Sequence, residues 1–144
     1  MMKFFNDETK VFDFGYIKVI PKMNYTDLIN KRKKIHFTKW NYPNNCGFDI
    51  HYDYIYVDQM YYKIDLSFID SHLKFLYISI YNNNEVREIR KNGWSYFNES
   101  KQSQLIERYT KWLKDKKITN NHYFTVDVHV RLHDVVPKIR IEYS

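Results

Sequence analysis

Three side chains that can bind a metal alternate along one short segment of the chain. Asp49, His51 and Asp53 are spaced two residues apart, so a β-strand would place all three on one face. Carboxylates and an imidazole are legitimate ligands of a divalent cation, which raises the hypothesis of a metal-dependent enzyme. The same alternation is typical of any strand with a solvated face. Because no second ligand cluster accompanies it, we predict no metal and no other cofactor.

Two other positions carry residues with catalytic potential. Asp127 and His129 form a polar row with acid–base capability, since imidazole titrates near neutrality. A cross-strand charge ladder with Arg140 and Glu142 on the neighbouring strand explains this row fully, because neighbours two residues apart on one strand are too common to indicate catalysis. Cys46 lies in a turn-like Pro-Asn-Asn-Cys-Gly run without the helix start that activates a thiol, and it is expected to be an ordinary thiol.

Glycine is scarce, which excludes the common nucleotide-binding motifs. The chain has 3 glycines, Gly15, Gly47 and Gly93, and they are too far apart to form a phosphate-cradling loop or a dinucleotide fingerprint. With no catalytic constellation found, we predict a protein that is not an enzyme.

One dense basic run stands beside a cluster of aromatic residues. Lys31, Arg32, Lys33 and Lys34 are consecutive in a chain of net charge +6, and such runs bind phosphate backbones by releasing counterions. Cations at a helix C-terminus are also stabilised by the helix dipole. Trp40 and Tyr42 follow the run and are the aromatic residues that we expect to anchor a partner. These six residues are the predicted binding site.

The first part of the chain predicts a strand, a helix and a loop. The apolar residues of Lys10–Ile20 predict a strand that Pro21 stops. A short helix is expected next, with Asn24 as its N-cap and the basic run at its end. The proline and asparagines of Phe37–Gly47 predict a loop.

Three consecutive strands are predicted next. Phe48–Val57, Tyr61–Ile69 and Leu73–Tyr81 alternate apolar with polar residues, which is the pattern of half-buried strands. The second and third strands are expected to form a hairpin. The expected pairs are Phe68 with Leu76, Leu66 with Ile78 and Ile64 with Ile80, across a turn at Asp70–His72.

The last third predicts one firm helix and a strand pair. Glu85–Asn92 is expected to be a charged connection, and Trp94 to pin a turn to the sheet. A helix capped by Asn98 or Ser100 follows. Its apolar stripe is Leu105, Ile106, Tyr109, Trp112 and Leu113. The alternation of Tyr123–Leu132 and of Ile139–Tyr143 predicts two paired antiparallel strands.

Together these elements predict a single α+β domain spanning residues 1–144. Its antiparallel sheet of about six strands packs against two helices in the order β-α-β-β-β-α-β-β. A lone cysteine suits a reducing compartment, and the sequence shows neither a signal peptide nor an apolar run long enough to span a membrane. We therefore expect a cytoplasmic protein that does not bind membranes.

The pattern of the last fifty residues resembles a group of small bacterial proteins of similar length. The residues that carry it are Gly93-Trp94-Ser95, then a capped helix ending in Lys111-Trp112-Leu113, and a closing strand Ile139–Tyr143 after Tyr123. The hairpin at Phe68–Leu73 and the helix start Tyr25–Leu28 also resemble it, although the glycines that often mark the group's last loop are missing here.

The resemblance implies an immunity protein of the kind encoded beside polymorphic or contact-dependent toxins. Such a protein would neutralise one cognate toxin by stoichiometric binding, without turnover. A nucleic-acid-binding protein that uses Lys31–Lys34 and a metal-dependent enzyme that uses Asp49, His51 and Asp53 remain the alternatives. The positive charge argues against a nuclease toxin as partner, because a basic nuclease cleft favours an acidic inhibitor.

Overall fold

The computed structural model of the chain describes residues 3–24, 26, 36–42, 45–130 and 135–144. For residues 36–42, 45, 46 and 48 it describes the backbone alone. The predicted helix from Asn24 to the basic run therefore falls mostly outside the described residues.

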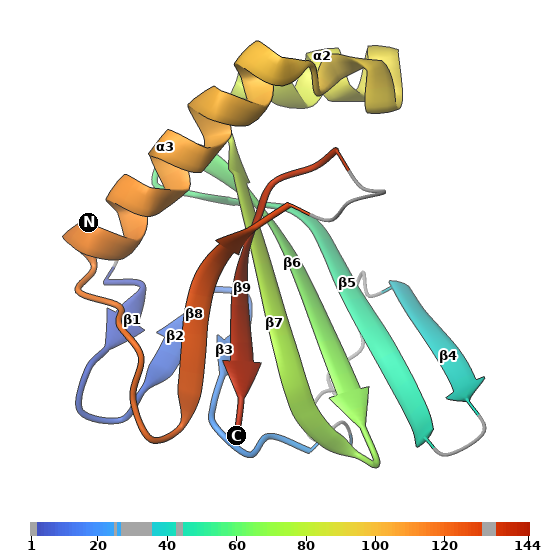
Figure 1. Cartoon of the computed structure of the whole chain (residues 1–144), viewed down its shortest axis with the longest axis vertical. Helices are drawn as coiled ribbons and strands as arrows, with labels where there is room; N and C mark the ends of the chain where they lie inside the picture. Colours follow the sequence, from blue (N-terminus) through green and yellow to red (C-terminus); the bar gives the residue numbers. More distant parts are fainter. Residues whose placement is uncertain (1–2, 25, 27–35, 43–44, 131–134) are drawn as a thin grey trace.

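Two antiparallel sheets and two α-helices make up the described fold (Figure 1). The small sheet has the order β1-β2-β3 and the large sheet the order β4-β5-β6-β7-β9-β8. The strands of the small sheet are β1 (Phe5–Asn6), β2 (Val11–Asp13) and β3 (Lys18–Val19). Those of the large sheet are β4 (His36–Tyr42), β5 (Asn45–Val57), β6 (Met60–Ile69), β7 (His72–Tyr81), β8 (Phe124–His129) and β9 (Lys138–Tyr143). The helical elements are α2 (Asn83–Asn92), the 3₁₀ turn η1 (Gly93–Tyr96) and α3 (Glu99–Asp115). The predicted α+β class and antiparallel pairing are confirmed. The predicted order β-α-β-β-β-α-β-β was wrong in detail, because the described strands form two sheets, with β1, β2 and β3 in place of one first strand, and β4 and α2 are additional elements.

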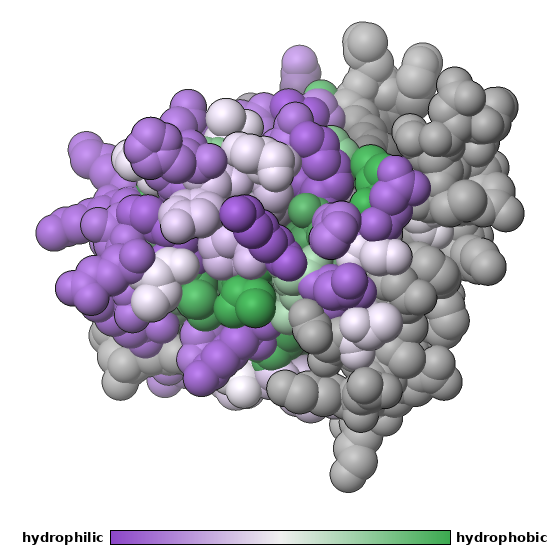
Figure 2. All heavy atoms as spheres, turned by 90° about the horizontal axis from the view of Figure 1, so that it is seen from below, coloured by the Kyte–Doolittle hydropathy of each residue, from purple (hydrophilic) through white to green (hydrophobic). Residues whose placement is uncertain are grey.

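The small sheet and α3 cover the same face of the large sheet. The ring centre of Phe4 lies 4.9 Å from that of Tyr62 in β6 and 5.8 Å from that of Trp112 in α3. The ring centre of Phe12 in β2 lies 5.7 Å from that of Phe124 in β8. The buried apolar residues form one continuous cluster through both sheets and the helices. From below, the described surface is mostly hydrophilic, with small apolar areas (Figure 2).

Three predicted elements were wrong. The stretch Lys10–Ile20 is not one strand, because the Asp13 carboxylate accepts a hydrogen bond from the Gly15 N–H and the chain reverses between β2 and β3. The described residues of Phe37–Gly47 are not a loop but belong to β4 and to the start of β5, where Trp40 pairs with Gly47. The turn signal in this stretch outweighed its aromatic and β-branched residues, which favour strands.

The charged connection predicted at Glu85–Asn92 is instead helix α2. Asn82 caps it by accepting from the Glu85 N–H at 2.8 Å, and the Glu85 carboxylate accepts from the Asn82 N–H at 2.7 Å. This reciprocal capping box is an N-terminal helix signal that the sequence contained. Trp94 does not pin a turn, since its side chain is 67% exposed. The predicted cap Asn98 and the packing of Trp112 against the core are confirmed.

At its end β7 stays paired with β6, but on its other side it is held by side chains from α3 instead of a strand. Pairing of β7 with β9 ends at Ile78, so the backbone of Ile80 needs other partners. The Ile80 N–H donates to the Tyr109 hydroxyl at 3.1 Å, and Arg108 Nη1 donates to the Ile80 carbonyl at 2.9 Å. Helix α3 therefore continues the hydrogen-bond ladder of the sheet.

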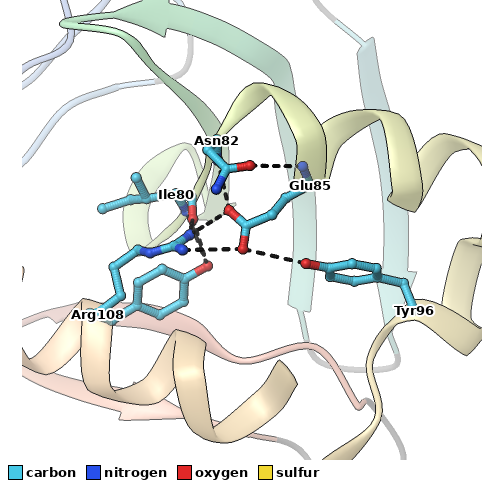
Figure 3. Close-up of polar contacts among 6 residues, drawn as sticks. Ile80, Asn82, Glu85, Tyr96 and Arg108 are labelled. Atoms are coloured by element: carbon cyan, nitrogen blue, oxygen red, sulfur yellow. Dashed lines mark hydrogen bonds and ion pairs between the residues drawn. The ribbon is translucent and has the colours of Figure 1, made fainter. Parts of the chain in front are cut away.

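The same arginine forms an ion pair that joins the two helices (Figure 3). Arg108 donates two hydrogen bonds to Glu85, at 2.7 and 3.1 Å, and the Tyr96 hydroxyl donates a third at 3.3 Å. Burial of the Glu85 carboxyl acts to raise its pKa, but the hydrogen bonds from Arg108 and the Asn82 N–H together act more strongly and hold the pKa below its ordinary value.

Two hairpin turns have backbone that favours glycine without containing one. The first is Asp58-Gln59, with φ of 48° and 69° between the paired residues Val57 and Met60. Asp70 and Ser71 have φ of 49° and 74° between the paired residues Ile69 and His72, the positive angles of a two-residue type I′ turn. This turn and a bulge after Ser67 set the register of β6 and β7. The observed pairs are Phe68 with Leu73, Leu66 with Leu76, Ile64 with Ile78 and Tyr62 with Ile80. The predicted hairpin is confirmed, but its register was wrong by two residues at Leu66 and Ile64 and by three at Phe68, beyond the bulge.

Replacing Ser71 with glycine is expected to stabilise the protein. Ser71→Gly creates the Asp-Gly pair that type I′ turns prefer and removes the strain of a positive φ, so the free energy of unfolding should rise by about 1 kcal/mol. Urea denaturation measures the change. The control Ser67→Gly, inside β6, should lower stability by a similar amount, and a loss of stability in Ser71→Gly would contradict the turn assignment.

The Glu85–Arg108 pair is expected to make stability fall in acid. A carboxyl with a depressed pKa contributes stability above its unfolded-state pKa of about 4.5, and this contribution is lost as the pH falls through the folded-state pKa. Glu85→Gln should lose about 2 kcal/mol at pH 7 because it leaves a half-buried guanidinium without its charge partner. Its stability should also depend less on pH below 4.5. The matched control is Glu107→Gln, on the exposed face of α3; equal acid sensitivity of Glu85→Gln and the native protein would refute this role.

Candidate functional site

One row of polar and aromatic side chains crosses the large sheet from β5 to β8. In this row His51 pairs with Asp65, Asp65 with Tyr77, Tyr77 with Arg140 and Arg140 with Asp127. Side chains alternate along a strand, and the neighbours of these residues on each strand point into the core. The row and its neighbours Asp49, Ser67, Phe75, Lys138 and Glu142 are called the outer face below.

At one end of the row, a histidine is held by a carboxylate. The Nδ1–H of His51 donates to the Asp65 carboxylate at 2.6 Å, and both side chains are partly buried. The hydrogen bond to Asp65 raises the pKa of His51, while burial opposes the change; the negative charges of Asp65, Asp49 and Asp53 raise it further. A histidine oriented in this way keeps its Nε2 free for a proton or a ligand.

At the other end of the row, the charges are paired within the sheet. Arg140 donates to both oxygens of Asp127, at 3.1 and 3.0 Å. Nearby, Lys74 lies 3.5 Å from the Glu142 carboxylate. Exposed pairs of this kind add little stability, but they hold the charges in fixed positions. The cross-strand charge ladder predicted for Asp127 and Arg140 is confirmed.

The centre of the outer face is aromatic. Phe75 and Tyr77 stack with ring centres 5.8 Å apart and an angle of 19°, and the Lys138 ammonium lies 5.8 Å from the Tyr77 ring centre. Beside them is a shallow hollow of about 320 Å³. Its lining includes Asp49, His51, Asp65, Phe75, Tyr77 and Lys138. This arrangement can contact a partner through apolar rings and can exchange a proton through His51.

The proposed metal ligands are not brought together as a set. Asp49 and His51 line the hollow, but β5 has a bulge between Tyr52 and Ile55, and Asp53 lines a different groove. Across the described ranges, no group of three His, Cys, Asp or Glu residues is placed to hold a metal ion.

The predicted binding residues lie at or beyond the limit of what the structure describes. Lys31, Arg32, Lys33 and Lys34 fall outside the described residues. Trp40 and Tyr42 belong to β4, at the edge of the large sheet, where their backbones pair with Gly47 and Asn45. Their side chains are among those not described.

Sequence reasoning missed the aromatic centre and one partner of His51. Asp65 and Tyr77 occupy outward positions in the two strands that were predicted, so the alternation contained the signal. The predicted register paired Asp65 with Ser79 instead of Tyr77, because the bulge after Ser67 could not be seen in the sequence.

Comparisons of the chain with family models, with curated proteins and with solved structures found no match. In the described part of the chain, no helix has the length and apolar character needed to cross a membrane. The functional interpretation therefore rests on the outer face itself.

Removing the carboxylate beside His51 is expected to lower the histidine pKa. Because the folded-state pKa of His51 is raised, the pair stabilises the protein fully below about pH 6.5, and this stabilisation is lost as the pH rises through the folded-state value. In Asp65→Asn, NMR titration of the imidazole should give a lower pKa, and the pH dependence of stability above 6.5 should flatten. The control Asp127→Asn should leave the His51 titration unchanged; an unchanged titration in Asp65→Asn would contradict the assigned hydrogen bond.

Proposed function

We propose that the protein is a non-enzymatic binding module: a cytoplasmic immunity protein that neutralises a cognate bacterial toxin by stoichiometric docking. The observation that carries this proposal is the outer face, where a stacked aromatic pair is flanked by fixed ion pairs. Aromatic anchors surrounded by polar groups are typical of protein–protein interfaces. The immunity role itself derives from the sequence resemblance.

The size of the sheet suits a protein partner. The five strands from β5 to β8, spaced about 4.8 Å apart, give a surface roughly 19 Å wide, and β6 and β7, of 10 residues each, extend about 33 Å. The flat area is roughly 600 Å², so a partner that also contacts the rim of the face would bury the roughly 800 Å² that stable interfaces need. A small molecule would use only the hollow beside Tyr77.

Charge narrows the choice of partner. The outer face carries both signs in internal pairs, whereas the whole chain has a net charge of +6. Long-range attraction therefore favours a toxin domain with an acidic surface, and complementary charge of this kind speeds association. A toxin whose active site is a basic nuclease cleft fits less well.

Affinity purification with two matched variants tests the proposal. The tagged protein, purified from its native cells and washed at high salt, should retain one protein at near-equal stoichiometry. Tyr77→Ala should weaken that complex by about 2 kcal/mol, roughly 30-fold, since it removes a central aromatic anchor. Trp94→Ala removes an exposed aromatic residue from η1 and should leave binding unchanged.

The other outcomes are equally informative. Nucleic acid that is retained at low salt and lost at high salt would overturn the proposal in favour of the basic run Lys31–Lys34. If Tyr77→Ala leaves the complex intact, or if Trp94→Ala disrupts it, the outer face is not the surface that binds the partner.

A further inference from the structure

A second hollow lies away from the outer face, between the β2–β3 turn and the bulge of β5. It is a groove of about 570 Å³, here called the tyrosine groove. The side chains that matter are Phe14, Tyr16, Tyr52, Asp53, Tyr54 and Tyr56. The groove is therefore lined by aromatic rings together with one carboxylate.

The bulge of β5 forms one wall of the groove. Pairing with β6 shifts between Tyr52 and Ile55, and Tyr54 has a φ of 57°. A bulky L-residue rarely adopts a positive φ, and bulges re-aim the side chains of the strand that contains them. As a result, consecutive residues of β5 line the same groove instead of alternating between two faces.

Aromatic rings at the rim of this groove remain accessible. Tyr16 is 51% exposed and packs edge-on against Tyr52, with ring centres 6.0 Å apart. Tyr56 is 59% exposed and lies 4.8 Å from the ring of Tyr61. The aromatic surface thus continues from the groove onto β6. A protein partner with one side chain in the groove could therefore also contact the rings on β6.

The electrostatics of the groove favour a cation. Burial and the neighbouring Tyr16 raise the pKa of Tyr52 to about 12, so this phenol is neutral at pH 7. Among the described lining residues, Asp53 is then the one with a formal charge. The Tyr54 ring already meets one cation of the chain, since the guanidinium of Arg90, which does not line the groove, lies 5.1 Å from its centre. Aromatic faces combined with a carboxylate are the chemistry that recognises an organic cation.

We propose that the tyrosine groove is a second binding site, which accepts a lysine or arginine side chain of a protein partner. The Asp53 carboxylate pairs with the inserted cation, and the rings of Tyr16, Tyr52 and Tyr56 contact its alkyl stem and charged end. The tyrosine groove shares no residue with the outer face, so this proposal is tested independently of the proposed immunity function.

A pair of small probes that differ in charge tests this site. N-acetyl-lysine N-methylamide and its neutral norleucine counterpart have the same stem, and binding of each is followed by NMR shifts of the Tyr52–Val57 amides. The lysine probe should shift these amides and bind about tenfold more tightly than the norleucine probe. Equal binding of the two probes, or no shift up to their solubility limit, would overturn the proposal.

Variants assign the effect to the groove. Asp53→Asn should reduce binding of the lysine probe to the norleucine level, and Tyr16→Leu should weaken it while leaving the fold intact. Asp127→Asn, which removes a carboxylate from the outer face, is the matched control and should bind normally. If Asp53→Asn binds as well as the native protein, or if tetramethylammonium binds and the lysine probe does not, a partner's basic side chain is not the ligand.

Discussion

The fold depends on the hydrogen bonds made by the backbone at the end of β7, beyond the point where its pairing with β9 ends. Ile80 presents a donor and an acceptor that no strand meets on that side, and Tyr109 and Arg108 of α3 supply the missing partners. Arg108 can do so because Glu85, at the start of α2, neutralises it and fixes its orientation. One ion pair thereby sets the position of both helices relative to the sheet.

This anchoring leaves the large sheet covered on one face. The small sheet and α3 pack against the inward residues Tyr62 and Phe124. The outward residues of β6, β7 and β9 remain half-buried side by side. Asp65 of β6 is paired with His51 of β5, and Arg140 of β9 with Asp127 of β8. A face of this kind is preorganised for a partner, because little side-chain order remains to be imposed on binding.

The sequence predicted those elements whose signal is local. Alternation located β6, β7, β8 and β9, and the apolar stripe with its Asn98 cap located α3. The errors arose where contacts between residues far apart in the sequence determine the register and direction of the strands. Two glycine-free turns with positive φ and the bulges after Ser67 and Tyr52 fix register and direction, and these features leave little trace in composition. For this reason Asp49 and His51 line one hollow and Asp53 lines another, although the prediction placed all three on one face.

Hydroxyl-radical footprinting of the complex would show whether the outer face is the surface that meets a protein partner. Phe75 and Tyr77 should be oxidised in the free protein and become protected when the partner is bound, while Trp94 should be oxidised equally in both states. Protection of Trp94 with continued oxidation of Phe75 and Tyr77 would contradict the outer face as the binding surface, since the partner would then sit on the helical end of the molecule.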